Sequence, residues 1–280
     1  MLLKLTAPMK QQAGSKYKEH KMHEFLTGRT GHPGLEELKK YRYAHRGFHD
    51  KPVVPENSLP AFRRAIEHGF GAEFDLHLTK DGHLVVFHDD TTDRCTGQSG
   101  TLEDRTLEEV RALRLEGTEE QIPLFDEVLA LFEDSGLPLI IELKVVRGNY
   151  NELSEKVCKR LDSYKGRFCI ESFDPRAVAA VRKLRPVFIR GQLASDFVQS
   201  PESSPKGTRW ILTNLKMDTL SKPDFVAYNF DFKENGAFRK AVRKGIQGVV
   251  WTIRTPQAMK EAEKLGYICI FERFDPDMDL

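Results

Sequence analysis

Residues 72–90 read AEFDLHLTKDGHLVVFHDD, and this stretch decides the fold class. Its first half alternates polar and apolar residues, which predicts a strand with Glu73, Asp75 and His77 on one face. A turn follows, and the apolar run after it predicts a returning strand that ends at His88. The apolar residues Phe74, Leu76 and Leu78 are expected to face helices, because helices are expected after nearly every strand, which indicates an α/β protein.

A rhythm of strands and helices extends from this stretch in both directions, from residue 41 to the end of the chain. The segment PLIIELK at 138–144 is typical of a buried parallel strand whose carboxyl end reaches an active site. Another strand is expected at 187–191 and a loop at 195–208. About eight strands in all, without GxGxxG or GxxxxGK[ST], predict a TIM (β/α)8 barrel with a short N-terminal arm and a small insertion after the second strand.

The length of 280 residues is that of one barrel domain. Residues 1–40 are rich in Lys, Gln, His and Gly, and they are expected to form an N-terminal arm or helix. Residues 41–280 are expected to form the barrel. The arm contains His20, His23 and His32, which have no carboxylates at metal-ligand spacing and are expected at the surface.

The formal net charge is only +1, so no basic field exists to attract nucleic acid or an anionic membrane. Any recognition of phosphate must therefore be local. The four cysteines form no CxxC pair, which favours free thiols in a reducing cytosol. No apolar stretch approaches the ~20 residues of a membrane span, and the start has no signal-peptide pattern, so a cytoplasmic protein without membrane insertion is expected.

Polar residues stand where the predicted strands end, as they do at the catalytic face of a barrel. The first strand is expected to end at His45, and the apolar strand at 138–144 is interrupted by Glu142. Ionised carboxylates inside a barrel are costly unless a cation pairs with them. We therefore predict a metal-binding or catalytic role for Glu73, Asp75 and Glu142.

Five motifs resemble those of the glycerophosphodiester phosphodiesterase family in both order and spacing. They are AHRG (44–47), PENS (55–58), EFDLHLTKDGHLVVFHDD (73–90), IELK (141–144) and ESF (171–173). The resemblance runs from about residue 41 to at least 173 and continues more weakly through VVWTI (249–253). It implies a TIM barrel, in agreement with the strand count.

The resemblance also implies what individual residues do. It assigns His45 and His88 as acid–base residues, Glu73, Asp75 and Glu142 as ligands of one divalent cation, Arg46 and Lys144 as phosphate contacts, and Glu56 as a supporting carboxylate beside Arg46. A wall of the substrate pocket is a candidate role for Trp251, and a place in the core is the alternative.

The implied chemistry is consistent with these residue types. An all-carboxylate site suits Mg²⁺ or Ca²⁺ rather than zinc. Two imidazoles can exchange protons near neutral pH. The implied pathway begins when the glycerol 2-hydroxyl of a small glycerophosphodiester attacks its own phosphorus. That step expels the alcohol and gives a cyclic phosphate, which water opens to sn-glycerol 3-phosphate.

Two stretches near the C-terminus depart from the family pattern. Arg254 follows Trp-Thr-Ile where the family usually has Asn, which adds a cation at the mouth of the barrel. Residues 271–275, FERFD, stand in place of a threonine-aspartate stretch. Both departures bear on substrate detail rather than on the central chemistry.

Three other functions remain open. A lysophospholipase D or phospholipase of the same superfamily would need an apolar rim. An amidohydrolase-like enzyme would need His-x-His on the first strand, where this chain has His45-Arg46-Gly47. A non-catalytic phosphodiester-binding protein would typically have lost a histidine or a metal carboxylate. The released alcohol, the metal, the histidine that starts as base and the oligomeric state also stay open.

Overall fold

The computed structural model describes residues 31–199 and 206–278, and its centre is a closed barrel of eight parallel strands. The barrel strands are β1 (Tyr43–His45), β2 (Gly71–Leu78), β4 (Leu139–Leu143), β5 (Phe168–Ser172), β6 (Arg190–Ala194), β7 (Phe225–Asn229), β8 (Gln247–Ile253) and β9 (Ile268–Phe271). Because β1 pairs with both β9 and β2, the ring closes. The predicted TIM barrel is confirmed.

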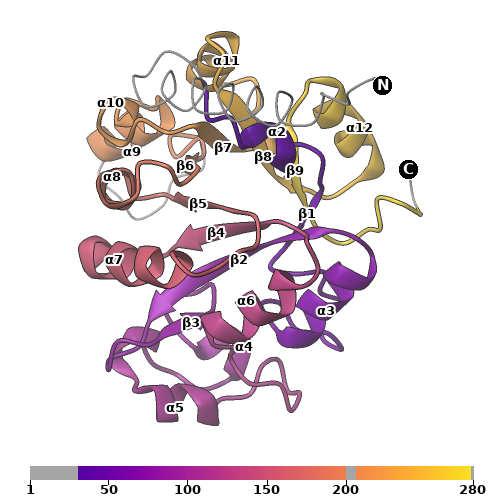
Figure 1. Ribbon diagram of the computed structural model, residues 1–280, viewed down its shortest axis with the longest axis vertical. Coiled ribbons are helices and arrows are strands. Elements are labelled where there is room, and N and C mark those ends of the chain that lie inside the picture. Colours follow the sequence, from indigo (N-terminus) through magenta and orange to yellow (C-terminus); the bar gives the residue numbers. More distant parts are fainter. Residues whose placement is uncertain (1–30, 200–205, 279–280) are drawn as a thin grey trace, which may run out of the picture.

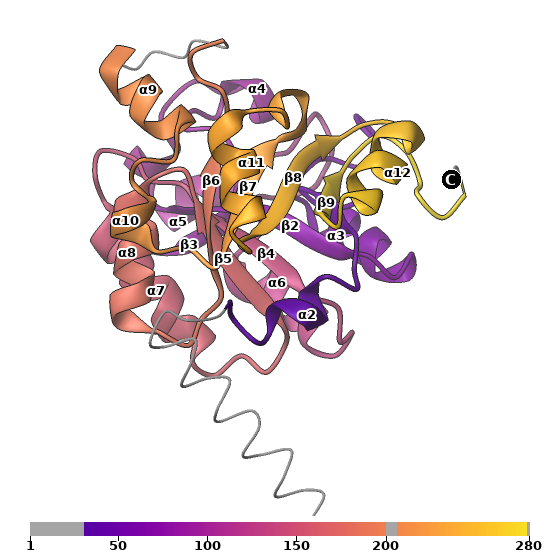
Figure 2. The same cartoon turned by 90° about the horizontal axis from the view of Figure 1, so that it is seen from above.

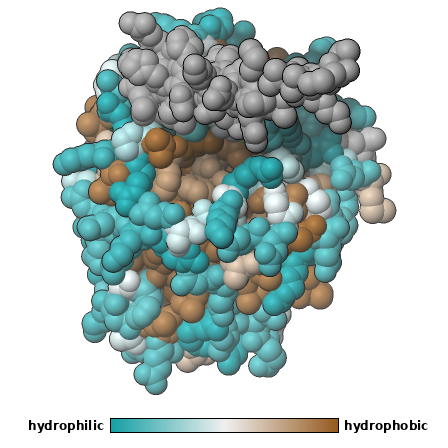
Figure 3. All heavy atoms as spheres, viewed as in Figure 1, coloured by the Kyte–Doolittle hydropathy of each residue, from teal (hydrophilic) through white to brown (hydrophobic). Residues whose placement is uncertain are grey.

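Helices surround the ring of strands (Figures 1 and 2). In chain order they are α2 (Leu35–Leu38), α3 (Leu59–Glu67), α4 (Asp93–Thr96), α5 (Leu107–Ala112), α6 (Phe125–Glu133), α7 (Tyr150–Leu161), α8 (Pro175–Leu184), α9 (Lys206–Thr213), α10 (Asp218–Ser221), α11 (Gly236–Arg243) and α12 (Pro256–Lys264). No helix of the described segments is long and apolar enough to cross a membrane. Hydrophilic residues cover much of the face seen in Figure 3, with hydrophobic ones showing between them.

Side-chain caps fix where several of these helices begin. The hydroxyl of Ser58 accepts a hydrogen bond from the backbone N–H of Ala61 at the start of α3. Asp174 and Asn235 cap α8 and α11 in the same way, and Thr255 caps α12. These caps satisfy backbone donors that a helix start leaves unpaired. Each helix therefore starts at a defined residue after its strand.

The predicted alternation along β2 is confirmed by its packing. Phe74 and Leu76 lie in the main apolar cluster, together with Phe62 of α3 and Phe125 of α6. The rings of Phe62 and Phe74 meet edge to face with centroids 5.6 Å apart. The opposite side of the strand is thereby left to its polar residues, inside the barrel.

An excursion after β2 accounts for the expected small insertion. The strand β3 (Leu84–Val86) returns antiparallel to β2, and α4 and α5 follow it. A separate apolar cluster that includes Phe87, Leu102, Val110 and Ile122 supports this region. In Figure 1 the excursion lies together at the lower end of the molecule. It places the residues after β3 beside the barrel mouth.

Three expectations were wrong in detail. The strand expected at 187–191 is found at Arg190–Ala194, because barrel pairing selects a segment that contains polar residues. The loop expected at 195–208 ends earlier, since α9 begins at Lys206. His32 is buried rather than at the surface, and its Nε2 lies 2.8 Å from the carbonyl of Val187. The other arm histidines lie outside the described residues.

Candidate active site

The candidate site lies at the carboxyl ends of the barrel strands, where a pocket of about 520 Å³ opens. Its lining is almost entirely charged or polar: His45, Arg46, His49, Asp50, Lys51, Glu56, Arg94, Arg254, Glu272 and Arg273. This is the face at which barrel enzymes place their catalytic residues. The position agrees with the predicted strand-end residues.

Three buried carboxylates meet next to His45 and Arg46 of this pocket. Glu73 and Asp75 come from β2 and Glu142 from β4, and one oxygen of each lies within 4.8 Å of the others. Asp75 and Glu142 are neighbours in the register of the two strands. Burial and the repulsion of Asp75 raise the pKa of Glu73 well above its usual value. The predicted grouping of these three residues is present, and their oxygens could hold a hard divalent cation.

Cationic and amide donors surround the carboxylates. The Nζ of Lys144 lies 3.0 Å from Glu142 and 3.6 Å from Asp75. Asn57 donates to Asp75 at 2.9 Å, and the backbone N–H of Arg46 donates to Glu73 at 3.1 Å. Burial opposes ionisation of Asp75, but the charges of His88 and Lys144 hold its pKa below the usual range. At least one carboxylate therefore stays charged inside the barrel.

His45 stands between the carboxylates and the pocket. Its Nδ1 donates to a carboxylate oxygen of Glu272 at 2.8 Å, and its Nε2 lies 3.9 Å from Glu73. Burial lowers the pKa of His45 to about 4, although the hydrogen bond to Glu272 acts in the opposite direction. The imidazole is thus neutral at pH 7, with Nε2 as its acceptor atom.

His88 has a carboxylate partner of its own. Its Nδ1 lies 2.6 Å from Asp89, and its side chain is partly exposed. His77 is fully buried, and its Nε2 lies 3.3 Å from the backbone oxygen of His88. The other ring nitrogen of His77 faces Glu103 at 3.3 Å. His77 therefore supports the segment that carries His88 rather than facing the pocket.

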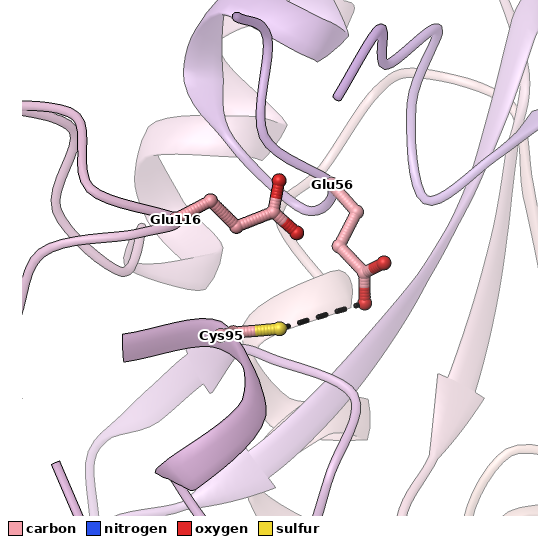
Figure 4. A group of neighbouring side chains, drawn as sticks. All are labelled: Glu56, Cys95 and Glu116. Carbon is pink, nitrogen blue, oxygen red and sulfur yellow. Dashed lines mark hydrogen bonds between the residues drawn. The ribbon is translucent and has the colours of Figure 1, made fainter. Parts of the chain in front are cut away.

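Glu56 belongs to a second acidic group, together with Cys95 and Glu116. Figure 4 shows Glu116 extending toward the side chain of Glu56, with a dashed line joining the thiol of Cys95 to the carboxylate of Glu56. Glu56 is already paired with cations, because Arg46 and Arg94 bind it at 2.7 and 2.6 Å and Lys51 also contacts it. These cations neutralise the group, so we interpret it as an anchor for Arg46 rather than a metal site.

Trp251 does not line the 520 Å³ pocket. Its ring meets Phe173 edge to face at 5.7 Å, and its buried indole N–H has no hydrogen-bond partner among the described residues. Trp251 packs against the apolar cluster around Leu193 and Val249. The packing thus favours the core alternative for Trp251.

Two carboxylates near the site were not singled out from the sequence. Glu272 was noted only as part of a departure from the family pattern, yet it binds His45. Glu171 pairs in register with Glu142, is buried, and has one carboxylate oxygen without a partner. Burial and the nearby charge of Glu142 raise the pKa of Glu171 well above its usual value. The signals for Glu171 were its position at a strand end and its place in the ESF motif, neither of which assigned it a role.

Known proteins resemble this chain over most of its length. The model of the glycerophosphoryl diester phosphodiesterase family matches residues 45–273. A glycerophosphodiester phosphodiesterase of Caldanaerobacter subterraneus is 40% identical over 240 residues, which cover 82% of this chain and 92% of that protein. The Mus musculus glycerophosphodiester phosphodiesterase 1 is 40% identical over 246 residues, 76% of this chain and 71% of that one. A Rattus norvegicus lysophospholipase D is 34% identical over 47% of this chain and 45% of its own length.

Solved structures show the same fold. An Oleispira antarctica phosphodiesterase in complex with sn-glycerol-3-phosphate has a TM-score of 0.71 at 23% identity and covers 84% of this chain and 93% of its own. A Silicibacter pomeroyi protein described as a glycerophosphoryl diester phosphodiesterase has a TM-score of 0.73 at 22% identity, with 89% and 99% covered. At these identities the likeness concerns the barrel itself.

Proposed function

The chain belongs to the glycerophosphoryl diester phosphodiesterase family, and from this premise we propose that it is a metal-dependent hydrolase of small glycerophosphodiesters. Its products would be an alcohol and sn-glycerol 3-phosphate. The observation that carries the proposal is the buried trio of Glu73, Asp75 and Glu142 next to a cationic pocket, two of whose lining residues contact it: His45 lies 3.9 Å from Glu73 and Arg46 lies 3.8 Å from Asp75. A site that only bound a phosphodiester would have no use for three carboxylates beneath an anion.

We assign the trio as the ligands of one divalent cation, Mg²⁺ or Ca²⁺. Their donor set is all oxygen, and the raised pKa of Glu73 indicates negative charge that the neighbouring side chains do not balance. When bound, the cation would polarise the phosphoryl group and stabilise the charge that develops on it. Arg46 and Lys144, which lie next to the trio, would hold the phosphate oxygens, and Glu56 would fix Arg46.

His45 and His88 are proposed as the acid–base pair. Because His45 is neutral and its Nδ1–H is held by Glu272, its Nε2 lone pair can accept a proton. In the first step one histidine would take the proton of the attacking glycerol 2-hydroxyl, and the other would protonate the departing alcohol. A cyclic phosphate results, and the two histidines exchange roles when water opens it. Proton transfer by a positioned side chain contributes typically about 10²–10⁴-fold to the rate.

The direct test is turnover of a panel of glycerophosphodiesters with and without EDTA, followed by the release of glycerol 3-phosphate. We expect turnover that EDTA removes and that Mg²⁺ or Ca²⁺ restores. The variants His45→Ala and His88→Ala should lose nearly all activity while their circular dichroism stays that of the wild type. His83→Ala, on an exposed side chain, is the matched control. Turnover that persists in EDTA would refute the metal site.

Lysophospholipase D activity is the second candidate, since the partly aligned rat relative has that name. The described pocket lining is charged and has no apolar residue that would hold an acyl chain. We therefore expect deacylated diesters to be hydrolysed faster than lysophospholipids of the same headgroup. The reverse order would favour the lipid-acting enzyme, and an absence of turnover on both would favour a binding protein.

The cysteines bear on the cellular setting of the enzyme. The four cysteines are buried and free. Free thiols fit a reducing compartment, so we propose a cytoplasmic enzyme with a small-molecule substrate. Localisation of a tagged full-length chain by fractionation tests this, and recovery of the chain outside the cytosol would contradict it.

A further inference from the structure

Two arginines on neighbouring strand ends share one carboxylate beside His45. Arg254 follows β8, Arg273 follows β9, and these strands are paired. The Nε of Arg254 lies 2.7 Å from one oxygen of Glu272, and the Nε of Arg273 lies 3.3 Å from that same oxygen. The other oxygen of Glu272 accepts from His45. Both guanidinium groups line the pocket.

The shortest contact of each arginine with Glu272 is through Nε. Within residues 31–199 and 206–278, neither has a second carboxylate within ion-pair distance, so four terminal N–H₂ groups are left for another acceptor. Their side chains are 46% and 71% exposed. The positive charges of the two arginines therefore face the single negative charge of Glu272, which also accepts a hydrogen bond from His45. This side of the pocket is left with surplus positive charge.

The other cations of the pocket are differently placed. Lys51 contacts both Glu56 and Glu116, and Arg94 binds Glu56 and Asp89. These two cations share three carboxylates, so they carry no surplus positive charge and hold the pocket wall together. The pocket carboxylate Asp50 lies 3.7 Å from Arg64, a residue outside the lining. The surplus is thus confined to the arginine pair, Arg254 and Arg273.

The substrate decides what that surplus can bind. In the proposed function, Arg46 and Lys144 hold the phosphate that is cleaved. The glycerol moiety carries hydroxyls only, so no charge on it could match the arginine pair. The remaining part of the substrate is the alcohol that leaves. A planar guanidinium binds carboxylate or phosphate oxygens in a two-pronged manner, which suits a group with two or three equivalent oxygens.

We propose that Arg254 and Arg273 form a subsite for an anionic group, carboxylate or phosphate, on the leaving alcohol, so that the enzyme prefers glycerophosphodiesters with a negatively charged headgroup. This inference rests on the proposed function and names its substrate class. Glu272 has a second purpose in this arrangement, because it orients the two guanidinium groups as well as His45. Cationic headgroups are disfavoured by the same charge.

The test uses diesters of sn-glycerol 3-phosphate that differ only at the far end of a four-carbon alcohol: 4-hydroxybutyrate, butanediol monophosphate, butane-1,4-diol and 4-aminobutanol. The chain length and the scissile bond are the same throughout. We expect kcat/KM to be at least about 10-fold higher for the anionic esters than for the diol ester, since a charged hydrogen bond of about 1.5 kcal/mol has that effect. The amino ester should be the poorest.

In the double variant Arg254→Gln/Arg273→Gln, the kcat/KM for the anionic esters should be close to the kcat/KM for the diol ester, so that their ratio is close to one. Loss of activity on every ester alike would reflect damage through Glu272 and His45, so the ratio rather than the rate is the readout. Arg185→Gln is the matched control, because Arg185 binds an exposed carboxylate of Asp162 through two nitrogens at the far end of α8. Its ratio should equal that of the wild type.

The outcomes separate the two proposals. A wild-type enzyme that cleaves the diol ester as fast as the anionic esters overturns the subsite but leaves the phosphodiesterase intact. The subsite is also overturned if the anionic-to-neutral ratio of kcat/KM in the double variant stays as high as in the wild type. Preference for one anion over the other identifies whether carboxylate or phosphate is recognised. If no ester is cleaved with Mg²⁺ or Ca²⁺ present, the proposed function fails and the subsite fails with it.

Discussion

At the scale of single residues, the carboxylate of Glu272 is the contact on which His45 depends. It accepts the Nδ1–H of His45 at 2.8 Å and so selects the tautomer whose Nε2 can act as a base. In Glu272→Gln the amide can donate to Nδ1 and reverse that tautomer. We expect kcat to fall by roughly 10²–10⁴-fold with a smaller change in KM, as measured by steady-state kinetics on a neutral diester.

Glu234→Gln removes an exposed carboxylate that binds Arg239 and serves as the control for this variant. The conservative change Glu272→Asp should recover part of the lost kcat, because it restores an ionised acceptor. A Glu272→Gln enzyme with wild-type kcat would show that His45 needs no fixed tautomer and would remove Glu272 from the mechanism.

The difference between Glu272 and the carboxylate trio explains what the sequence could predict at this scale. Glu73 and Asp75 are two residues apart on one strand, and strand geometry alone places them on the same side. Glu272 is 227 positions away from His45, and no local pattern links the two. Their contact exists only because β9 pairs with β1 and closes the ring.

At the scale of elements, His32 connects the segment before α2 to the loop before β6. Its Nε2–H donates to the carbonyl of Val187 at 2.8 Å, and its Nδ1 accepts from the N–H of Gly34 at 3.0 Å. The second bond requires the neutral ring, because a protonated Nδ1 cannot accept. We expect His32→Ala to lower the free energy of unfolding by about 1–3 kcal/mol in urea titrations at pH 7.5.

The pH dependence of this effect has a definite sign. Burial lowers the pKa of His32 below the ordinary histidine value of 6.5, so the folded chain binds fewer protons than the unfolded chain. The stability that His32 contributes is therefore present above pH 6.5 and declines as the pH falls through the folded pKa. The difference in free energy of unfolding between the wild type and His32→Ala should become smaller toward pH 5. A difference that becomes larger would contradict this account.

Strand patterns explain which elements were found from sequence. The run PLIIELK is apolar except at its end, and β4 was located almost to the residue. Arg190, Gly191 and Gln192 have no such pattern, yet they pair with β5 and β7 and form β6. The side chain of Gln192 donates to the backbone oxygen of Ser172, a contact that sequence periodicity cannot reveal. For such residues, closure of the barrel outweighs local preference.

At the scale of the whole molecule, counting apolar strands in the sequence predicted the eightfold barrel. It did not predict the free-energy cost of burying carboxylates inside that barrel. Glu73, Asp75 and Glu142 share a space where burial raises the pKa of two of them. Without a cation the trio would therefore destabilise the fold, and a bound cation should reverse that effect. At a concentration 100 times its Kd, a ligand specific to the folded state adds about 2.7 kcal/mol.

We therefore expect Mg²⁺ or Ca²⁺ to raise the Tm of the wild type by roughly 5–10 °C, with KCl of equal ionic strength as the reference.

Glu73→Gln removes one buried charge while its amide oxygen can still accept from the backbone of Arg46. Since the raised pKa of Glu73 makes the metal-free wild type less stable as the pH rises, Glu73→Gln should exceed its Tm at pH 8 without metal. Addition of metal should then leave the Tm of Glu73→Gln nearly unchanged. Because the wild type gains from the cation, the wild type should then have the higher Tm of the two. A variant that melts below the wild type without metal, or that gains as much from the cation, would mean that the trio is a structural network and not the metal site.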